Sequence, residues 1–140
     1  MIGANIIWIF NPSADKVLMC KRHKEPYTGL YSLVGGKIEE GEDGLTAAYR
    51  ELREETGIVG IELAHLMTAS YILEDSYALE VYVGKLRQES PVKGDAKGLT
   101  WIDVTEDFTD ITRFAGHGLL WHIHEQIKIN QQRWRLPCLE

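Results

Sequence analysis

The sequence predicts an α/β fold in which a mixed β-sheet lies between two helices. Two segments, near residues 44–56 and 112–129, carry apolar side chains at helical spacing, and the rest is dominated by short runs of β-branched and aromatic residues. Helices and sheets bury their apolar faces by packing in layers, so we expect an α/β/α sandwich. A chain of 140 residues has the length of one domain, residues 1–140.

The composition is that of an ordinary globular protein, with 44% hydrophobic residues, 26% charged residues and a formal net charge of −6. Without an excess of Lys and Arg, we expect no binding to nucleic acid or to anionic membranes. No segment reaches the roughly 18 apolar residues of a membrane span, and the N-terminus lacks the features of a signal peptide. Cys20 and Cys138 have no metal or redox spacing, so we expect reduced thiols and a cytoplasmic location.

Strands are predicted where β-branched and aromatic residues run between turn signals. The clearest is residues 77–86, in which apolar side chains occupy every second position. The polar segment 88–98 contains one proline and two glycines and is predicted to be a mobile loop. In chain order, the expected strands are residues 2–10, 16–22, 30–34, 58–65, 66–73, 77–86 and 99–104.

The first helix has clear start and stop signals. Asp43 is a suitable N-cap, and Gly57 stands where a left-handed residue would end the helix. The expected buried stripe consists of Leu45, Ala48, Tyr49 and Leu52. Three carboxylates share another face, those of Glu51, Glu54 and Glu55, and like charges at this spacing weaken a helix unless solvent or a cation offsets them. A divalent metal is the simplest explanation, and a solvated face with pairs such as Arg50 to Glu54 is the alternative.

The second predicted helix, residues 112–129, buries four apolar side chains, those of Leu119, Leu120, Ile123 and Ile127. Its histidines, His117, His122 and His124, are spaced by five and two residues and so do not form the i, i+4 pair of a zinc-binding helix. Trp101 and Trp121 each lie in an apolar run, so we expect both in the core.

Residues 36–58 match a known motif at every fixed position. They run Gly36, five residues, Glu42, seven residues, and then Arg50-Glu51-Leu52-Arg53-Glu54-Glu55-Thr56-Gly57-Ile58. This segment resembles the signature of the Nudix hydrolases, G-x5-E-x7-R-E-U-x-E-E-x-G-U, in which U is apolar. The resemblance implies the Nudix α/β/α sandwich and Mg2+-dependent hydrolysis of a phosphoanhydride bond in a nucleoside diphosphate derivative.

The resemblance also implies roles for the residues of the motif. Glu51, Glu54 and Glu55 would bind Mg2+, or Mn2+ as a substitute, and act in catalysis, with Glu51 as the candidate general base. The carbonyl of Gly35 would be a further ligand. Magnesium prefers such a set of a few carboxylates completed by waters and phosphate oxygens. The supporting residues would be Gly36, Glu42 and Arg50, of which Arg50 would pair with a glutamate and fix its rotamer.

MutT-like members of the family supply a fourth carboxylate shortly before the tryptophan of the last strand. Asp95, in the loop before Trp101, is the nearest match and an expected metal ligand. An ordinary solvated loop aspartate is the alternative interpretation. Glu89 in the same loop and Glu80 in the preceding strand are the other candidates.

The expected substrate is a nucleoside triphosphate, cleaved to monophosphate and pyrophosphate. Val34 replaces the proline that often precedes the double glycine, and with Tyr31 and Ser32 it resembles the subgroup that hydrolyses oxidised purine nucleotides. Ser32 is therefore a candidate for base recognition, and Arg22 and Lys37 are candidates for substrate binding. A sugar nucleotide or another nucleoside diphosphate derivative is the alternative, and a non-catalytic nucleotide sensor is a remote one. We expect a monomer or a homodimer.

Overall fold

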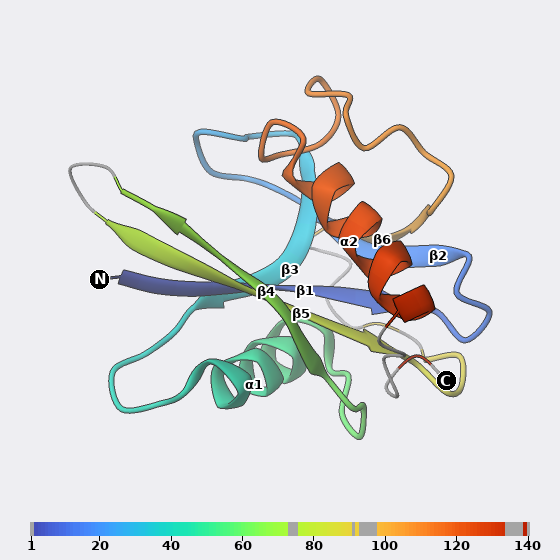
Figure 1. The fold of residues 1–140 in the computed structure, drawn as a ribbon, viewed down its shortest axis with the longest axis horizontal. Coiled ribbons are helices and arrows are strands. Elements are labelled where there is room, and N and C mark those ends of the chain that lie inside the picture. Colours follow the sequence, from blue (N-terminus) through green and yellow to red (C-terminus); the bar gives the residue numbers. More distant parts are fainter. Residues whose placement is uncertain (1, 73–75, 91, 93–97, 134–138, 140) are drawn as a thin grey trace.

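The computed structural model describes residues 2–72, 76–90, 92, 98–133 and 139. Its six-stranded sheet has the order β4-β5-β1-β3-β2-β6, and the helices α1 and α2 lie on opposite faces of it (Figure 1). The predicted α/β/α arrangement is confirmed. The elements are β1 (Ile2–Phe10), β2 (Lys16–Lys21), β3 (Tyr31–Lys37), α1 (Gly44–Thr56), β4 (Ala64–Tyr71), β5 (Tyr77–Lys85), β6 (Leu99–Asp103) and α2 (Leu119–Arg133).

Strand β1 is central to the sheet and makes it mixed, because it runs parallel to β5 and antiparallel to β3. Alternate residues of a strand face opposite sides of the sheet. Ile7 and Ile9 accordingly pack in the core beneath α1, whereas Trp8 and Phe10 pack in the core beneath α2. The long apolar run of β1 therefore supplies both hydrophobic layers.

Several predicted boundaries differ from the structure. Strand β3 extends to Lys37 and so contains the double glycine. Residues 58–63 form no strand, because Gly60 has a φ of 70° and the chain packs Ile58 and Ile61 against α1 as irregular backbone. Helix α2 begins at Leu119 and not near residue 112, since Gly116 and Gly118 have φ values of 93° and 94° that interrupt a right-handed helix.

The buried stripe of α1 is also shifted from the prediction. Leu45 and Tyr49 are 42% and 37% exposed. The buried residues of the helix are Ala47, Ala48, Leu52 and Thr56. Small side chains let the helix lie close to the sheet, and this turns the larger Leu45 and Tyr49 outward. The Tyr49 hydroxyl accepts a hydrogen bond from the backbone N–H of Leu63 at 2.9 Å, which secures the segment after the helix.

The aromatic residues expected in the core are distributed differently. Trp101 is partly buried and packs against the core beneath α1, but Trp121 is 46% exposed, so its predicted burial is wrong. Trp8 takes the central place and stacks on His124, with ring centroids 5.1 Å apart and planes at 13°. His117 lies before α2 and not on it. None of the described helices is long and apolar enough to cross a membrane.

His124 makes the stability of the fold depend on pH. Burial against Trp8 lowers the pKa of its imidazole below the ordinary 6.5, and the charge of Lys128 acts in the same direction. The unfolded chain therefore takes up a proton first, and the folded state loses stability as the pH falls below about 6.5. We expect His124→Phe to flatten the fall in melting temperature between pH 7.5 and pH 5. Parallel curves for the two proteins would contradict this.

Candidate functional site

Helix α1 begins and ends as the sequence predicts. The backbone N–H of Thr46 donates to the Asp43 carboxylate at 2.8 Å, and Gly57 takes a left-handed φ of 79° while its N–H donates to the carbonyl of Arg53. These caps fix the ends of the helix, and its interior positions set the directions of the three glutamates.

The double glycine of β3 lets the helix and the sheet meet closely at the site. A Cβ on Gly36 would lie 2.6 Å from Cδ of Glu51, so only glycine lets this carboxylate rest against the strand. A Cβ on Gly35 would collide with the backbone of β1 at Asn5 and Ile6. The Gly35–Gly36 step thus holds the catalytic candidate Glu51 within the fold, with only 12% of its side chain exposed.

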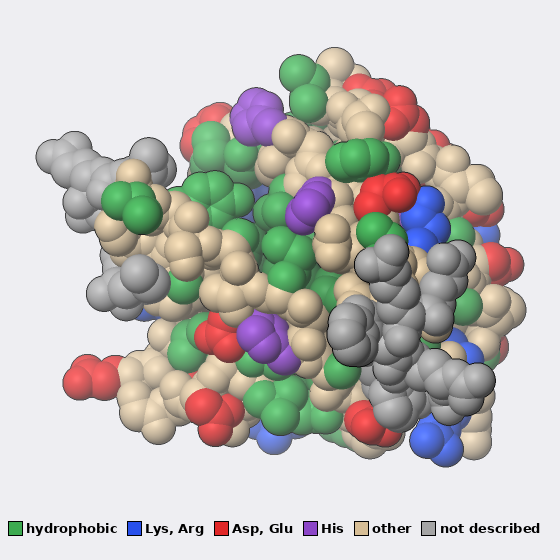
Figure 2. Space-filling view, in the orientation of Figure 1, with side chains coloured by type: hydrophobic (Ala, Val, Ile, Leu, Met, Phe, Trp, Pro, Cys, Tyr) green, Lys and Arg blue, Asp and Glu red, His purple; other side chains and the backbone are tan. Residues whose placement is uncertain are grey.

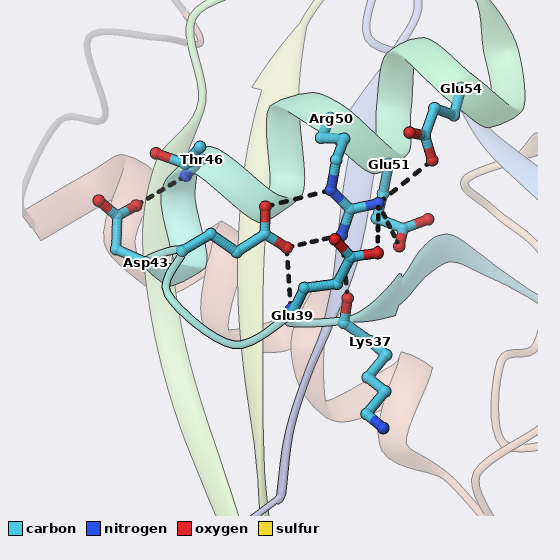
Figure 3. A network of polar contacts seen from close by, with 8 residues as sticks. Lys37, Glu39, Asp43, Thr46, Arg50, Glu51 and Glu54 are labelled. Atoms are coloured by element: carbon cyan, nitrogen blue, oxygen red, sulfur yellow. Dashed lines mark hydrogen bonds and ion pairs between the residues drawn. The ribbon is translucent and has the colours of Figure 1, made fainter.

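Arg50 connects the loop before α1 to the glutamates on it (Figure 3). Its guanidinium donates to both carboxylate oxygens of Glu42, at 2.6 and 3.1 Å, in a bidentate pair. It also donates to Oε1 of Glu51 and Oε2 of Glu54, both at 3.1 Å, and to the carbonyl of Lys37. The expected pairing of Arg50 with a glutamate is therefore present, and one cation orients three carboxylates.

This network shifts the ionisation of its members in favour of the charged forms. The hydrogen bond from Arg50 lowers the pKa of the Glu42 carboxyl, with a further contribution from the backbone N–H of Glu39. Glu42 in turn raises the pKa of the Arg50 guanidinium. Arg50 offsets only part of the negative charge around it, because Glu39, Glu42, Glu51 and Glu54 all lie within its ion-pair distance.

Two glutamates of the predicted metal set, Glu51 and Glu54, meet at Nη1 of Arg50, whereas Glu55 lines a cavity. Glu51 lies against Gly36, Glu54 has 54% of its side chain exposed, and Glu55 is partly buried beside a cavity of about 270 Å3 that Cys20 and His23 also line. Among the described residues, no three acidic, His or Cys side chains converge as a ready-made metal cage. The all-oxygen donors still suit Mg2+, which completes its shell with water and phosphate.

The structure describes two of the three candidates for a fourth carboxylate, Glu80 and Glu89. Asp95 lies outside the described residues. Glu80 covers Gly44, the first residue of α1, where it accepts a 2.8 Å hydrogen bond from the Tyr82 hydroxyl. About 10 Å of helix separates Gly44 from Glu51, so Glu80 is remote from the three glutamates. Glu89 is exposed and lines another cavity, beside residues 58–62.

A second feature of the site is a cavity of about 380 Å3, which we call the tyrosine pocket. In Figure 2, hydrophobic side chains gather between the projecting end of β4–β5 and the elements around α2. The polar and aromatic residues that line the pocket are Arg22, Tyr27, Ser32, Tyr71, Tyr77 and His117. Ile6 also lines it and pairs with Gly35, so the pocket adjoins the double glycine.

The aromatic rings and one cation give the tyrosine pocket its chemistry. Tyr71 and Tyr77 stack with centroids 4.8 Å apart, and the Arg22 guanidinium lies 6.0 Å from the centre of the Tyr27 ring. Nε of Arg22 is buried and has no hydrogen-bond partner among the described residues. The sequence indicated Arg22 and Ser32, but it did not indicate Tyr27 or His117. Lys37 is exposed, and its side chain points away from the glutamates (Figure 3).

Comparisons with known proteins place this geometry in a family. The model of the NUDIX domain matches residues 1–121. The ADP-ribose pyrophosphatase of Methanocaldococcus jannaschii is 42% identical over 45 residues, which cover 32% of this chain and only 27% of that relative.

Solved structures agree on the fold. The NUDIX domain of Shewanella oneidensis NrtR complexed with ADP ribose has a TM-score of 0.72 at 20% identity and covers 93% of this chain and 88% of that one. A MutT structure from work on Aliivibrio salmonicida and Vibrio cholerae has a TM-score of 0.69 at 20% identity, with 89% and 96% covered. Because the family model spans most of the chain, this protein belongs to the Nudix family.

Proposed function

We propose that the protein hydrolyses a phosphoanhydride bond in a nucleoside diphosphate derivative. The proposed substrates are nucleoside triphosphates, and this class contains the triphosphates of oxidised purine nucleosides. One observation carries the proposal. Glu51, which Arg50 orients together with Glu54, rests on Gly36, and Ile6, the strand partner of the neighbouring Gly35, lines an aromatic pocket. A nucleotide needs both features, because its phosphates are anionic and its base is a flat ring.

The residues at the phosphate end fit a divalent metal. Glu51, Glu54 and Glu55, with the carbonyl of Gly35, would hold Mg2+, which when bound neutralises phosphate charge and lowers the pKa of an attacking water. Arg50 holds Glu51 and Glu54 in fixed rotamers through its 3.1 Å hydrogen bonds. Glu51 is also the proposed general base, whose carboxylate accepts the proton from the attacking water.

The tyrosine pocket is the proposed site of the nucleoside. Tyr71, Tyr77 and Tyr27 offer ring faces for stacking, which is worth about 1–3 kcal/mol per base in proteins that bind nucleic-acid bases. Arg22 contributes a buried Nε–H that has no hydrogen-bond partner among the described residues, and Ser32 contributes a hydroxyl to the same pocket. A base or ribose that presents acceptor atoms would satisfy them. Because the Lys37 side chain points away from the glutamates of α1 (Figure 3), Lys37 is a proposed contact only for substrate phosphates that lie outside the glutamate set.

A second candidate substrate is ADP-ribose or another sugar nucleotide. The M. jannaschii relative is named for ADP-ribose hydrolysis, and the NrtR domain was solved with ADP ribose. Such a substrate shares the adenosine and the diphosphate and would use the same pocket and glutamates. The remote alternative is a nucleotide sensor without catalysis, although all the glutamates of the motif are present in this chain.

A panel of nucleoside triphosphates, oxidised purine nucleotides, ADP-ribose and sugar nucleotides separates these candidates. Each compound is incubated with the protein and Mg2+, and the products are identified by chromatography. We expect monophosphate and pyrophosphate from a triphosphate, and no turnover when EDTA is present. Faster release of AMP and ribose 5-phosphate from ADP-ribose would favour the second candidate, and tight nucleotide binding without products would favour the sensor.

The role of Arg22 is tested by Arg22→Gln. Hydrogen bonds from a charged donor contribute about 1.5–3 kcal/mol. We therefore expect KM to rise at least tenfold with little change in kcat, because the lost contact is the same in the ground state and the transition state. Lys24→Gln, an exposed cation in the same loop, is the matched control and should leave KM unchanged. An unchanged KM in Arg22→Gln would remove Arg22 from the binding site.

A further inference from the structure

One buried side chain near the glutamates has no structural explanation. Asn5, in the middle of β1, is 1% exposed, and neither its amide nitrogen nor its amide oxygen has a hydrogen-bond partner among the described residues. Burying an amide without hydrogen bonds destabilises a fold, and a leucine would fill a similar volume without this cost. Asn5 therefore needs a role that an apolar residue cannot perform.

The register of the sheet shows which groups surround Asn5. Ile7 and Ile9 pack beneath α1, and by strand alternation the side chain of Asn5 faces α1 as well. Its direct partners on the neighbouring strands are Gly36 of β3 and Glu80 of β5. Glu51 rests on Gly36, so its carboxylate lies one strand away from Asn5, a spacing of about 5 Å.

The course of α1 across the sheet supports this placement. The helix has Glu80 beneath its first residue, Gly44, and β3 beneath Glu51. About 10 Å of helix separates these two residues, and two strand spacings also amount to about 10 Å. Helix α1 therefore crosses from β5 over β1 to β3. Asn5 lies beneath its middle, with the Glu51 carboxylate on one side and the Glu80 carboxylate on the other.

We propose that Asn5 is a positioning residue for Glu51. Its amide nitrogen donates, through one ordered water, to the carboxylate oxygen of Glu51 that Arg50 does not bond. Arg50 holds Oε1 of Glu51 at 3.1 Å from the helix, and Asn5 holds Oε2 from the sheet. The carboxylate is then fixed from two sides and cannot rotate when a metal ion binds or leaves. This role rests on the proposed function, in which Glu51 binds the metal.

Two variants test the proposal without depending on activity alone. Asn5→Leu and Asn5→Ala both remove the amide, and Ile7→Val, on the same strand and the same face, is the matched packing control. The measurements are melting temperature, kcat and KM with the best substrate of the panel, and the Kd of Mn2+ from electron paramagnetic resonance of the free ion. Partners of this kind typically change metal affinity or activity by about 10–100-fold.

We expect Asn5→Leu to melt no lower than wild type, with kcat reduced about tenfold or more, KM within twofold and a Kd for Mn2+ raised about tenfold. Asn5→Ala should show the same changes in kcat and Kd, and Ile7→Val neither. A folded Asn5→Leu or Asn5→Ala with wild-type kcat and Kd overturns the proposal, as does failure of both variants to fold. Absence of any Mg2+-dependent hydrolysis in the wild type would instead refute the proposed function.

Discussion

Replacing Glu55 by glutamine is expected to lower kcat by about 100-fold or more and to leave the melting temperature unchanged. Loss of a group that only supports a metal ligand already costs about 10–100-fold, and loss of the ligand itself should cost more. Glu55 is only partly buried and lines a cavity, so its carboxylate contributes little to packing. Glu54→Gln should behave in the same way, since more than half of its side chain is exposed.

Glu62→Gln provides the control for these variants, because Glu62 is an exposed acid on the segment after α1 and away from the glutamate set. It should keep the wild-type kcat at every Mg2+ concentration. If Glu54→Gln and Glu55→Gln both retain near wild-type kcat at saturating Mg2+, the metal assignment is wrong. A fall in melting temperature equal to that of a core variant would show that these side chains support the fold.

The sequence predicted those parts of the structure that depend on local signals. The caps Asp43 and Gly57 determine both ends of α1, and the apolar run from Ile2 to Phe10 is β1 without any change of boundary. The residues of the motif were known from their spacing, and the ion pairs of Arg50 follow from placing one cation among several glutamates. These features lie within a few residues of one another, so helix periodicity and side-chain chemistry suffice to infer them.

The tyrosine pocket could not be predicted, because it depends on contacts between distant segments. Tyr27 comes from the loop after β2, Tyr71 and Tyr77 from facing ends of β4 and β5, and His117 from the turn before α2. From the helical spacing of apolar residues, the start of α2 was predicted too early, and the turn that contains His117 was therefore predicted as helix. Left-handed glycines decide the true start, and a pattern of apolar residues does not record backbone dihedral angles.

The buried stripe of α1 also depends on a contact between distant segments, that of the helix with the sheet. Substitution in this stripe has the largest expected effect on stability. Leu52→Ala should lower the free energy of unfolding by about 2–5 kcal/mol, the usual cost of a cavity left by a buried leucine. Leu52 is 0% exposed and packs among Ile7, Ile9 and Val34 in the core beneath α1. Urea denaturation followed by circular dichroism measures the change.

Leu45→Ala is the matched control on the same helix, because the hydrophobic pattern places Leu45 and Leu52 on one stripe, whereas the structure leaves Leu45 42% exposed. Its substitution should change the free energy of unfolding by no more than about 0.5 kcal/mol, as surface substitutions do. Equal losses in the two variants would restore the predicted stripe and contradict the orientation of α1. That orientation also directs Glu51 onto Gly36, so the same pair of variants tests the geometry on which the proposed metal site depends.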